Sequence, residues 1–362
     1  MKKILIALLV FLVCVYALPV IILGAQPQQT SDMGDKKEQN GDTDYRSAMD
    51  IWNDTIRNMM DSAQKSDDDN SLSDELEDYD EKTLLRVLID GEVREMTVRD
   101  YLVGVVAAEM PAAFPIEALK AQAVAARSYM LHKIENSDPS SHPQGAQLCD
   151  DYTHCTAFFD IESGGRELWG DSCDYYAERI RAAVEDTDGV VAVYQGESIA
   201  AVFHSASDGM TEDAENIWGV KYSYLTPVKT SGGSASPNFY GTVVFSQSDF
   251  REMIVDVYPS AAMDGHYSQW IGEIRRSQSG TVLGIVVGGV SIKGTEIRTL
   301  FGLNSANFNI EFKNGEVIFT TVGTGHGVGM SQYGAREMAL NGSYFDEIIY
   351  HYYSGVQLMV KN

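Results

Sequence analysis

Glu109 is the residue of this 362-residue chain whose surroundings most favour acid–base chemistry. Leu102, Val105 and Val106 precede it at helical spacings, so Glu109 continues the apolar face of a short helix. Pro111 disfavours helical geometry in the residue before it, which places Glu109 in the last helical turn or just beyond it. Burial and the negative end of the helix dipole both raise the pKa of a carboxyl group. A carboxylic acid that stays protonated near neutral pH is a candidate general acid.

A second helix is predicted from Pro115 to about His132, because proline suits the first helical position and apolar residues follow at helical spacings. Lys120 and Arg127 lie at the edge of the apolar stripe of this helix. Their aliphatic stems could lie along the surface while the charges reach solvent. Because the turn between the two helices also presents Glu109, we favour a pocket wall toward which both cations point.

The stretch after a predicted hairpin places His204, Ser205 and Ser207 at the end of a strand, where site residues commonly emerge. Glu215 and Trp218 follow in a loop, and an exposed tryptophan beside polar groups suits the face of a sugar ring. His204 could instead be a core histidine bonded to backbone, and the two serines could form a turn. No Gly-x-Ser-x-Gly motif surrounds either serine, so a serine nucleophile lacks support.

A glycine-rich stretch at residues 323–334 surrounds His326, Ser331 and Gln332. Glycine allows the backbone to approach a ligand closely, so this stretch is a candidate binding loop. It lacks both the glycine order of dinucleotide-binding loops and the Gly-Lys-Ser/Thr of phosphate-binding loops. Phosphate binding is therefore not predicted.

The polar, loop-rich region at residues 137–174 contains candidate metal ligands. His142, Cys149 and Cys155 offer the nitrogen and sulfur ligands that Zn²⁺ takes, although their spacing is looser than in a zinc finger. Outside the cell, Cys149 and Cys155 could instead form a disulfide. The residues alone leave both possibilities open.

The charge of the chain restricts its partners. It carries 27 basic and 52 acidic residues, a net charge of −25, which argues against nucleic acid or any other partner bound mainly through phosphate groups. Residues 26–82 contain 17 acidic and 6 basic residues and few apolar ones. Such a composition does not offset the entropy lost on ordering, so we predict an acidic, disordered spacer here.

Lys2 and Lys3 precede an uncharged apolar run at residues 4–24. The run is long enough to cross a bilayer as a helix, and the lysines favour a cytoplasmic N-terminus. A cleaved secretory signal is the alternative, but the run exceeds the usual apolar segment of such signals and lacks a good cleavage site. We therefore predict a single-pass membrane anchor at residues 1–25 and a catalytic region at residues 83–362 on the outer side.

The region from residue 83 onward is predicted to be an α+β fold with two lobes. Asp90-Gly91 and Asn314-Gly315 are strong signals for two-residue hairpins. Thr97 is expected to cap the helix that follows it. Residues 223–320 are rich in strands and contain no residue that we assign to chemistry. We expect a strand-rich region with helices around a central cleft that holds the candidate acid.

Three stretches of this chain together resemble one known family. They are AAEMP followed by EALKAQAVAARSY, then VFHSASDGMTEDAENIWG at residues 202–219, and GTGHGVGMSQYGAREMA at residues 323–339. In this order they resemble the stage II sporulation protein D family, which includes the amidase enhancers. The resemblance extends from about Leu84 to the C-terminus.

The resemblance implies a peptidoglycan lytic transglycosylase, which cuts glycan strands between N-acetylmuramic acid and N-acetylglucosamine. Glu109 would protonate the leaving oxygen and then take a proton from the muramic acid 6-hydroxyl as this group attacks the anomeric carbon. The product would be a 1,6-anhydro end. A hydrolase would instead need a second carboxylate, for which Asp208, Asp213 and Glu215 are candidates. A non-catalytic enhancer of a peptidoglycan amidase is a further alternative.

The resemblance also implies roles for other residues. Contacts with substrate are expected from Lys120, Arg127, His204, Ser205, Ser207, Glu215, Trp218, His326, Ser331 and Gln332. Structural zinc becomes favoured over a disulfide at His142, Cys149 and Cys155. Water, His154 or Cys173 would supply the fourth ligand.

The cellular setting implied by the resemblance is engulfment during sporulation. The catalytic region would act at the mother-cell membrane that faces the forespore. Its partners would be peptidoglycan glycan strands, an amidase resembling stage II sporulation protein P and a membrane scaffold resembling stage II sporulation protein M.

Overall fold

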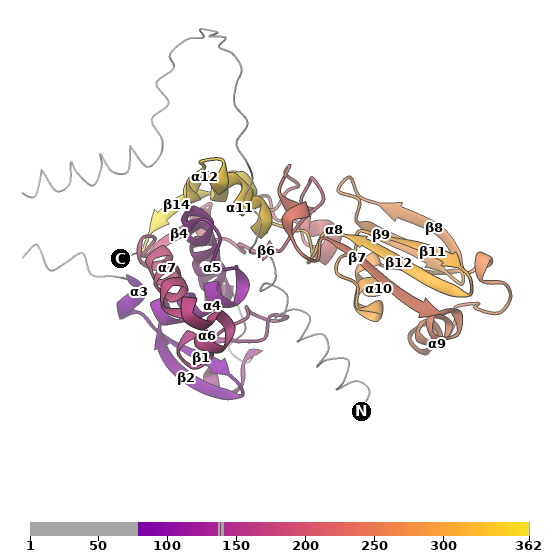
Figure 1. Cartoon of the computed structure of the whole chain (residues 1–362), viewed down its shortest axis with the longest axis horizontal. Helices are drawn as coiled ribbons and strands as arrows, with labels where there is room; N and C mark the ends of the chain where they lie inside the picture. Colours follow the sequence, from indigo (N-terminus) through magenta and orange to yellow (C-terminus); the bar gives the residue numbers. More distant parts are fainter. Residues whose placement is uncertain (1–78, 137, 139–140, 362) are drawn as a thin grey trace, which may run out of the picture. The chain divides into compact units, whose positions relative to one another are not determined.

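The computed structural model of the chain describes residues 79–136, 138 and 141–361 (Figure 1). The predicted anchor lies outside these residues, as does nearly all of the predicted spacer. No helix in the described part is long and apolar enough to cross a membrane. Tyr79–Lys82, which the sequence assigns to the spacer, form helix α3, and Asp80 within it is buried. The spacer prediction is corrected for these residues, which belong to the folded region.

Helices and strands are mixed along the described chain, and the strands form several small sheets, so the fold is of the α+β kind. The longer helices are α4 (Val98–Glu109), α5 (Ile116–Asn136), α6 (Ile161–Trp169), α7 (Cys173–Glu185), α8 (Ala214–Trp218), α9 (Gln247–Val257), α10 (Gly294–Phe301), α11 (Gln332–Leu340) and α12 (Phe345–Tyr352). The strands are β1 (Leu84–Ile89), β2 (Glu92–Thr97), β3 (Leu148–Cys149), β4 (Val190–Tyr194), β5 (Glu197–Ser198), β6 (Phe203–His204), β7 (Tyr240–Ser246), β8 (Ile271–Arg276), β9 (Val282–Val287), β10 (Val290–Ile292), β11 (Phe308–Lys313), β12 (Glu316–Val322), β13 (Met330–Ser331) and β14 (Gln357–Val360).

Local signals set both ends of α4. The side chain of Thr97 accepts a 3.1 Å hydrogen bond from the backbone N–H of Asp100, so Thr97 caps the helix as predicted. Met110 has extended backbone geometry before Pro111, which ends the helix at Glu109. The candidate acid therefore occupies the last helical position.

Helix α5 lies at the centre of the first hydrophobic core cluster, where it contacts α4, α7, α11, α12 and β4 (Figure 1). The sequence predicts one apolar stripe on this helix. The structure instead buries every residue from Ala118 to Ser128 except Lys120, because the many alanines let neighbouring elements approach on all sides.

Two sheets of three strands complete the first cluster, in the orders β2-β1-β3 and β14-β4-β5. The β1–β2 hairpin turns at Asp90 and Gly91, whose φ angles of 53° and 83° suit a tight hairpin turn. The predicted hairpin is confirmed.

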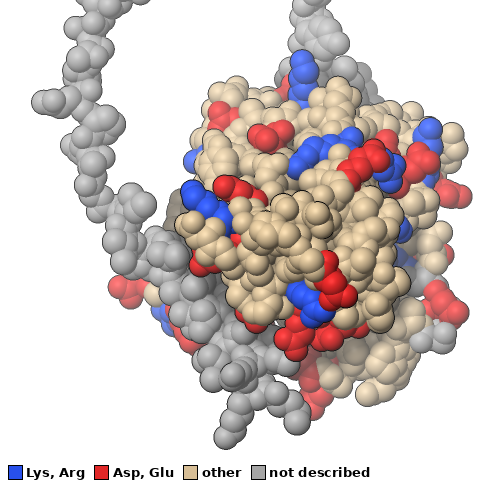
Figure 2. All heavy atoms as spheres, turned by 90° about the vertical axis from the view of Figure 1, so that its right-hand side faces the viewer, with Lys and Arg blue, Asp and Glu red and all other residues tan. Residues whose placement is uncertain are grey.

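A second hydrophobic core cluster is built from residues between Phe250 and Phe319. Its sheets have the orders β10-β9-β8 and β11-β12-β7, with α9 and α10 packed on them. The predicted Asn314-Gly315 hairpin joins β11 to β12. On the face over this strand-rich part, Figure 2 shows acidic and basic side chains in small mixed groups among uncharged ones.

The second cluster is inserted between two strands that pair with each other. Strands β6 and β13 form a parallel pair in which Ser331 lies opposite His204. After β6 the chain still contributes Ala214, Tyr224 and Leu225 to the first cluster, then builds the second cluster and returns to the first at Val328. Two motifs that are distant in the sequence are therefore neighbours in space.

Candidate active site and metal centre

A cavity of about 830 Å³ opens beside the end of α4 and is lined mainly by residues around the first core cluster, with Arg298 contributed by α10, a helix of the second cluster. Its charged and aromatic lining residues are Glu109, Tyr129, His132, Lys133, Tyr152, Phe203, His204, Trp218, Tyr222, Arg298 and His326. The cavity thus brings together the candidate acid and three of the predicted substrate contacts, His204, Trp218 and His326.

Glu109 is partly buried at the wall of this cavity. Its Oε1 accepts a 3.0 Å hydrogen bond from the backbone N–H of Ala157. Burial raises the pKa of Glu109 to about 7, although this hydrogen bond acts in the opposite direction. Near neutral pH a large share of the group is protonated, as a general acid requires. Among the described residues that line the cavity, Glu109 is the only one with a carboxyl group.

Ser331 and Gln332 lie at the start of α11, outside the cavity lining. Ser331 is fully buried and caps α11 by accepting a 3.3 Å hydrogen bond from the N–H of Gly334. Gln332 Nε2 donates to the backbone carbonyl of Glu109 at 2.8 Å and to Oε1 of Gln122 at 3.3 Å. Neither residue lines the cavity beside Glu109, and their contact with substrate stays a prediction. Gln332 holds the backbone at the end of α4 through its hydrogen bond to the carbonyl of Glu109.

His204 and His326 face the cavity as neutral imidazoles. His204 Nδ1–H donates to the carbonyl of Val328 at 3.0 Å, and the hydroxyl of Ser207 donates to His204 Nε2 at 2.5 Å. Burial lowers the pKa of His204 to about 4. Burial, together with nearby His204 and Arg298, lowers the pKa of His326 to about 3. The hydroxyl of Ser207 is used in the hydrogen bond to His204, and Ser207 does not line the cavity.

Trp218, at the end of α8, is 44% exposed, and its ring centroid lies 5.0 Å from that of His326. The exposed ring leaves apolar surface free at the cavity. Ser205 contributes its backbone carbonyl, which accepts a 3.1 Å hydrogen bond from Tyr333 N–H. Glu215 is exposed on α8. Neither Ser205 nor Glu215 lines the cavity, and the substrate contacts of both stay predictions.

Arg127 is fully buried, and it does not line the cavity. Its Nε donates to a carboxylate oxygen of Asp80 at 2.9 Å, and a second guanidinium nitrogen donates to the carbonyl of Val190 at 3.0 Å. Lys120 pairs with Glu117 at 3.2 Å and with Asp186 at 3.0 Å. The charges of both cations are neutralised within the fold, so these contacts do not support the prediction that Lys120 and Arg127 bind substrate.

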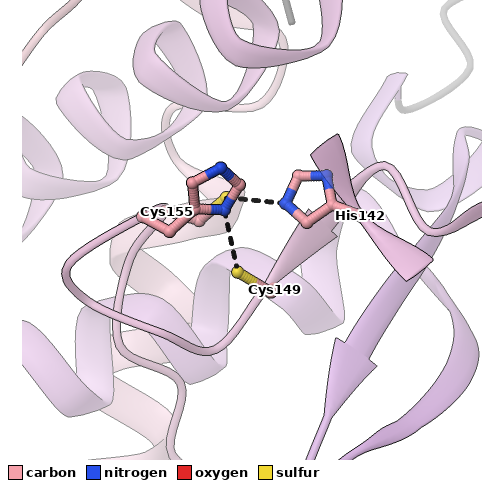
Figure 3. A group of neighbouring side chains, drawn as sticks. His142, Cys149 and Cys155 are labelled. Carbon is pink, nitrogen blue, oxygen red and sulfur yellow. Dashed lines mark hydrogen bonds between the residues drawn. The ribbon is translucent and has the colours of Figure 1, made fainter. Parts of the chain in front are cut away.

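His142, Cys149 and Cys155 point toward one another from β3 and the loops beside it (Figure 3). His154 joins them, and the four ligand atoms all lie within 4.8 Å of one another. Neither Cys149 nor Cys155 is in a disulfide. Cys173 packs against α6 at Gly165 and is not part of the group, so His154 is the better fourth ligand.

The distances within this group suit a tetrahedral ion. His142 Nε2 lies 3.3 Å from Cys155 Sγ, and His154 Nδ1 lies 3.4 Å from Cys149 Sγ and 3.7 Å from Cys155 Sγ. Tetrahedral zinc with bonds of about 2.0–2.3 Å separates its nitrogen and sulfur ligands by about 3.5 Å. These three distances are close to that value, so the group could hold a metal ion.

One loop connects Glu109 with the group of His142, Cys149, His154 and Cys155, which is called the metal group below. Cys155 and Thr156 line the cavity, and the next residue, Ala157, binds Glu109. The hydroxyl of Thr156 also bonds to the buried hydroxyl of Tyr101 on α4 at 2.8 Å. Ordering of this loop therefore fixes the donor that orients the carboxyl group.

The chain is similar in sequence to a known family and to several known proteins. A family described as "Stage II sporulation protein" matches residues 90–194. The "Stage II sporulation protein D" of Bacillus subtilis (strain 168) is 37% identical over 270 residues, which cover 74% of this chain and 75% of that protein. This chain belongs to the stage II sporulation protein D family. The protein of the same name from Bacillus amyloliquefaciens is 36% identical over 267 residues, with the same coverage. The "Amidase enhancer" of Bacillus subtilis (strain 168) is 26% identical over 309 residues, which cover 71% of this chain and 40% of that protein.

This member of the stage II sporulation protein D family has cavity residues that its motifs do not reveal. Arg298 comes from α10, within residues 223–320, where the sequence offers no signal for a site. Lys133 lies beyond the predicted end of its helix, which continues to Asn136. Its spacing of four residues from Tyr129, another lining residue, could have indicated a shared face.

Glu212 is a buried carboxylate of this family member whose role its local sequence does not indicate. It accepts hydrogen bonds of 2.5 Å from the hydroxyl of Ser277 and 2.8 Å from the side chain of Asn216. It thereby ties α8, which carries Trp218, to the residue that follows β8. Glu212 is a structural link between the parts that line the cavity.

Proposed function

We propose that this chain is a peptidoglycan lytic transglycosylase. It cleaves glycan strands that have lost their stem peptides, between N-acetylmuramic acid and N-acetylglucosamine, and leaves 1,6-anhydro-N-acetylmuramic acid ends. The observation that carries the proposal is that Glu109, with its pKa raised to about 7, is the only carboxyl group among the described lining residues. One carboxyl group suffices for this reaction, because it can act first as an acid and then as a base.

The reaction follows from this single group. Protonated Glu109 donates its proton to the glycosidic oxygen as the bond to the anomeric carbon breaks. The resulting carboxylate is held by the N–H of Ala157 and accepts the proton of the muramic acid 6-hydroxyl. The 6-oxygen then forms a bond to the anomeric carbon, which closes the anhydro ring. Glu109 is protonated again, and no water enters the reaction.

A hydrolase with two carboxylates is the weaker candidate. Such enzymes need the second carboxylate about 5–9.5 Å from the first. Asp213 caps α8 by accepting from Glu215 N–H, and both Asp208 and Glu215 are exposed. None of the three lines the cavity. The name of the amidase enhancer relative favours a second candidate function, stimulation of a peptidoglycan amidase without cleavage.

Zinc is the ion that we assign to His142, Cys149, His154 and Cys155. Four protein ligands make a closed site, which is typical of structural zinc. The ion, when bound, supplies order to the loop that carries Ala157. The chain's own residues perform the proton transfers.

The setting that we propose is engulfment during sporulation, supported by the family and by the names of its members. The apolar run at residues 4–24 serves as a single-pass anchor, with the catalytic region outside the mother-cell membrane and facing the forespore. An amidase resembling stage II sporulation protein P supplies denuded strands, and a scaffold resembling stage II sporulation protein M holds the assembly. Mass spectrometry of the products formed from denuded glycan tests the reaction.

A further inference from the structure

Arg298 brings a positive charge to the cavity without a negative partner. Its Nε donates to the carbonyl of Leu303 at 3.3 Å. Within the described part of the chain, it forms no ion pair with a carboxylate at 4.0 Å or less. The guanidinium therefore lacks a counter-charge within the described protein.

The charge balance of the cavity is opposite to that of the chain. The chain has 52 acidic and 27 basic residues, yet this cavity is lined by Arg298 and Lys133 and by one carboxyl group, that of Glu109. Much of that group is protonated near neutral pH. His204 and His326 are neutral there. The cavity is thus positively charged within an acidic protein.

A partly buried cation without a counter-charge is unfavourable, and burial lowers the pKa of Arg298. The guanidinium nevertheless stays charged, because the pKa of arginine is far above neutral pH. Its planar fork matches a carboxylate, to which it can donate two parallel hydrogen bonds. The missing counter-charge is therefore most simply supplied by an anionic group of the ligand.

We infer that Arg298 binds a carboxylate of the substrate, with Lys133 adding to the positive potential. The inference rests on the proposed function, since in a glycan strand this carboxylate is the lactyl group of muramic acid. A muramic acid that carries a stem peptide has a neutral amide at that position, whereas a denuded one has a free carboxylate. Arg298 is accordingly the residue by which the cavity selects denuded strands.

Binding measurements in the Glu109→Gln background test this role without cleavage. The ligands are a muramic acid-containing oligosaccharide with free lactyl carboxylates and the same oligosaccharide with those groups converted to methylamides. We expect at least about tenfold tighter binding of the carboxylate form. Adding Arg298→Gln should remove this preference by weakening binding of the carboxylate form alone. Added salt should reduce the preference of the parent protein.

Two further variants make the test specific. Arg298→Lys keeps the charge but loses the planar fork, so it should retain only part of the preference. Arg251→Gln removes an exposed arginine on α9 that pairs with Asp264 outside the cavity, and this variant should retain the full preference for the carboxylate form. Equal affinity of the parent protein for the two ligands, or an unchanged preference in folded Arg298→Gln protein, would overturn the inference.

The binding test of Arg298 and the product test of the proposed reaction can each fail without the other failing. Hydrolytic products from the wild-type protein would refute the transglycosylase assignment, yet a preference that depends on Arg298 would still support carboxylate binding. Conversely, anhydro products with no preference for the carboxylate ligand would leave the reaction intact and reject the role of Arg298. Failure of the parent protein to bind either ligand would also reject it.

Discussion

The backbone N–H of Ala157 donates a 3.0 Å hydrogen bond to Oε1 of Glu109, and Ala157 lies two residues after Cys155. The metal group and the candidate acid are therefore joined by a very short piece of chain. This relationship makes the geometry of Glu109 depend on whether the loop of Cys155 is ordered. It also makes the two features testable together.

Metal removal should loosen this loop. Protein prepared without chelator should contain one zinc per chain, and His154→Ala should lower both its zinc content and its thermal stability, because a closed zinc site stabilises the fold around it. The matched control is Cys173→Ala, which should keep its zinc. Elemental analysis and thermal unfolding measure both effects. A disulfide between Cys149 and Cys155 in non-reducing peptide maps would contradict the zinc assignment.

The raised pKa of Glu109 predicts opposite effects of Glu109→Gln on activity and on stability. Loss of the acid should reduce glycan cleavage by a factor of about 10² or more. Wild-type cleavage should itself fall as the pH rises through about 7, where the protonated form is lost. Glu252→Gln, at an exposed position on α9, should behave as wild type. Undiminished turnover in Glu109→Gln protein would place the acid elsewhere.

The stability effect has a definite sign. The folded-state pKa of Glu109 is above its unfolded value, so the folded state binds more protons between about pH 4.5 and pH 7 and loses stability as the pH rises through that range. A glutamine side chain at this position does not ionise. Glu109→Gln should therefore be more stable than wild type at pH 8, by at most about 3 kcal/mol, with a smaller difference at pH 5. Denaturant unfolding at both pH values measures this, and equal stabilities at pH 8 would contradict the raised pKa.

Arg127→Ala should reduce stability rather than substrate affinity. It leaves the buried carboxylate of Asp80 unpaired, which typically costs about 3–5 kcal/mol. Arg166→Ala breaks an exposed pair with Asp174 and should cost no more than about 1 kcal/mol. Denaturant unfolding and glycan binding separate the two roles. Normal stability with strongly reduced binding would restore the substrate role predicted from the sequence.

The features that the sequence predicts correctly depend on neighbouring residues. The Asp90-Gly91 hairpin, the Thr97 cap and the end of α4 before Pro111 each follow from backbone preferences within a few positions. The burial of Glu109 follows from the apolar residues that precede it on the same helix. Such local signals were sufficient to place the candidate acid.

The features that the sequence does not reveal depend on distant partners. Arg127 lies in a helix that is covered on all sides, and its partner Asp80 comes from a segment whose composition indicates a spacer. Helix α6 contains Gly164 and Gly165, which disfavour a helix locally, yet they leave the space that Phe159 and Cys173 occupy. Arg298 likewise reaches the cavity only because a separate core cluster folds beside it. No local pattern encodes these contacts.

The central claim is that Glu109 acts without a second carboxylate and without water, and the masses of the reaction products test it most directly. Wild-type protein should convert denuded glycan into fragments that end in 1,6-anhydro-N-acetylmuramic acid, one water lighter than hydrolysis products. Fragments with free reducing ends would contradict the claim, because water would then have reached the anomeric carbon. Intact glycan together with stimulation of an amidase would contradict it as well and would make the chain an enhancer.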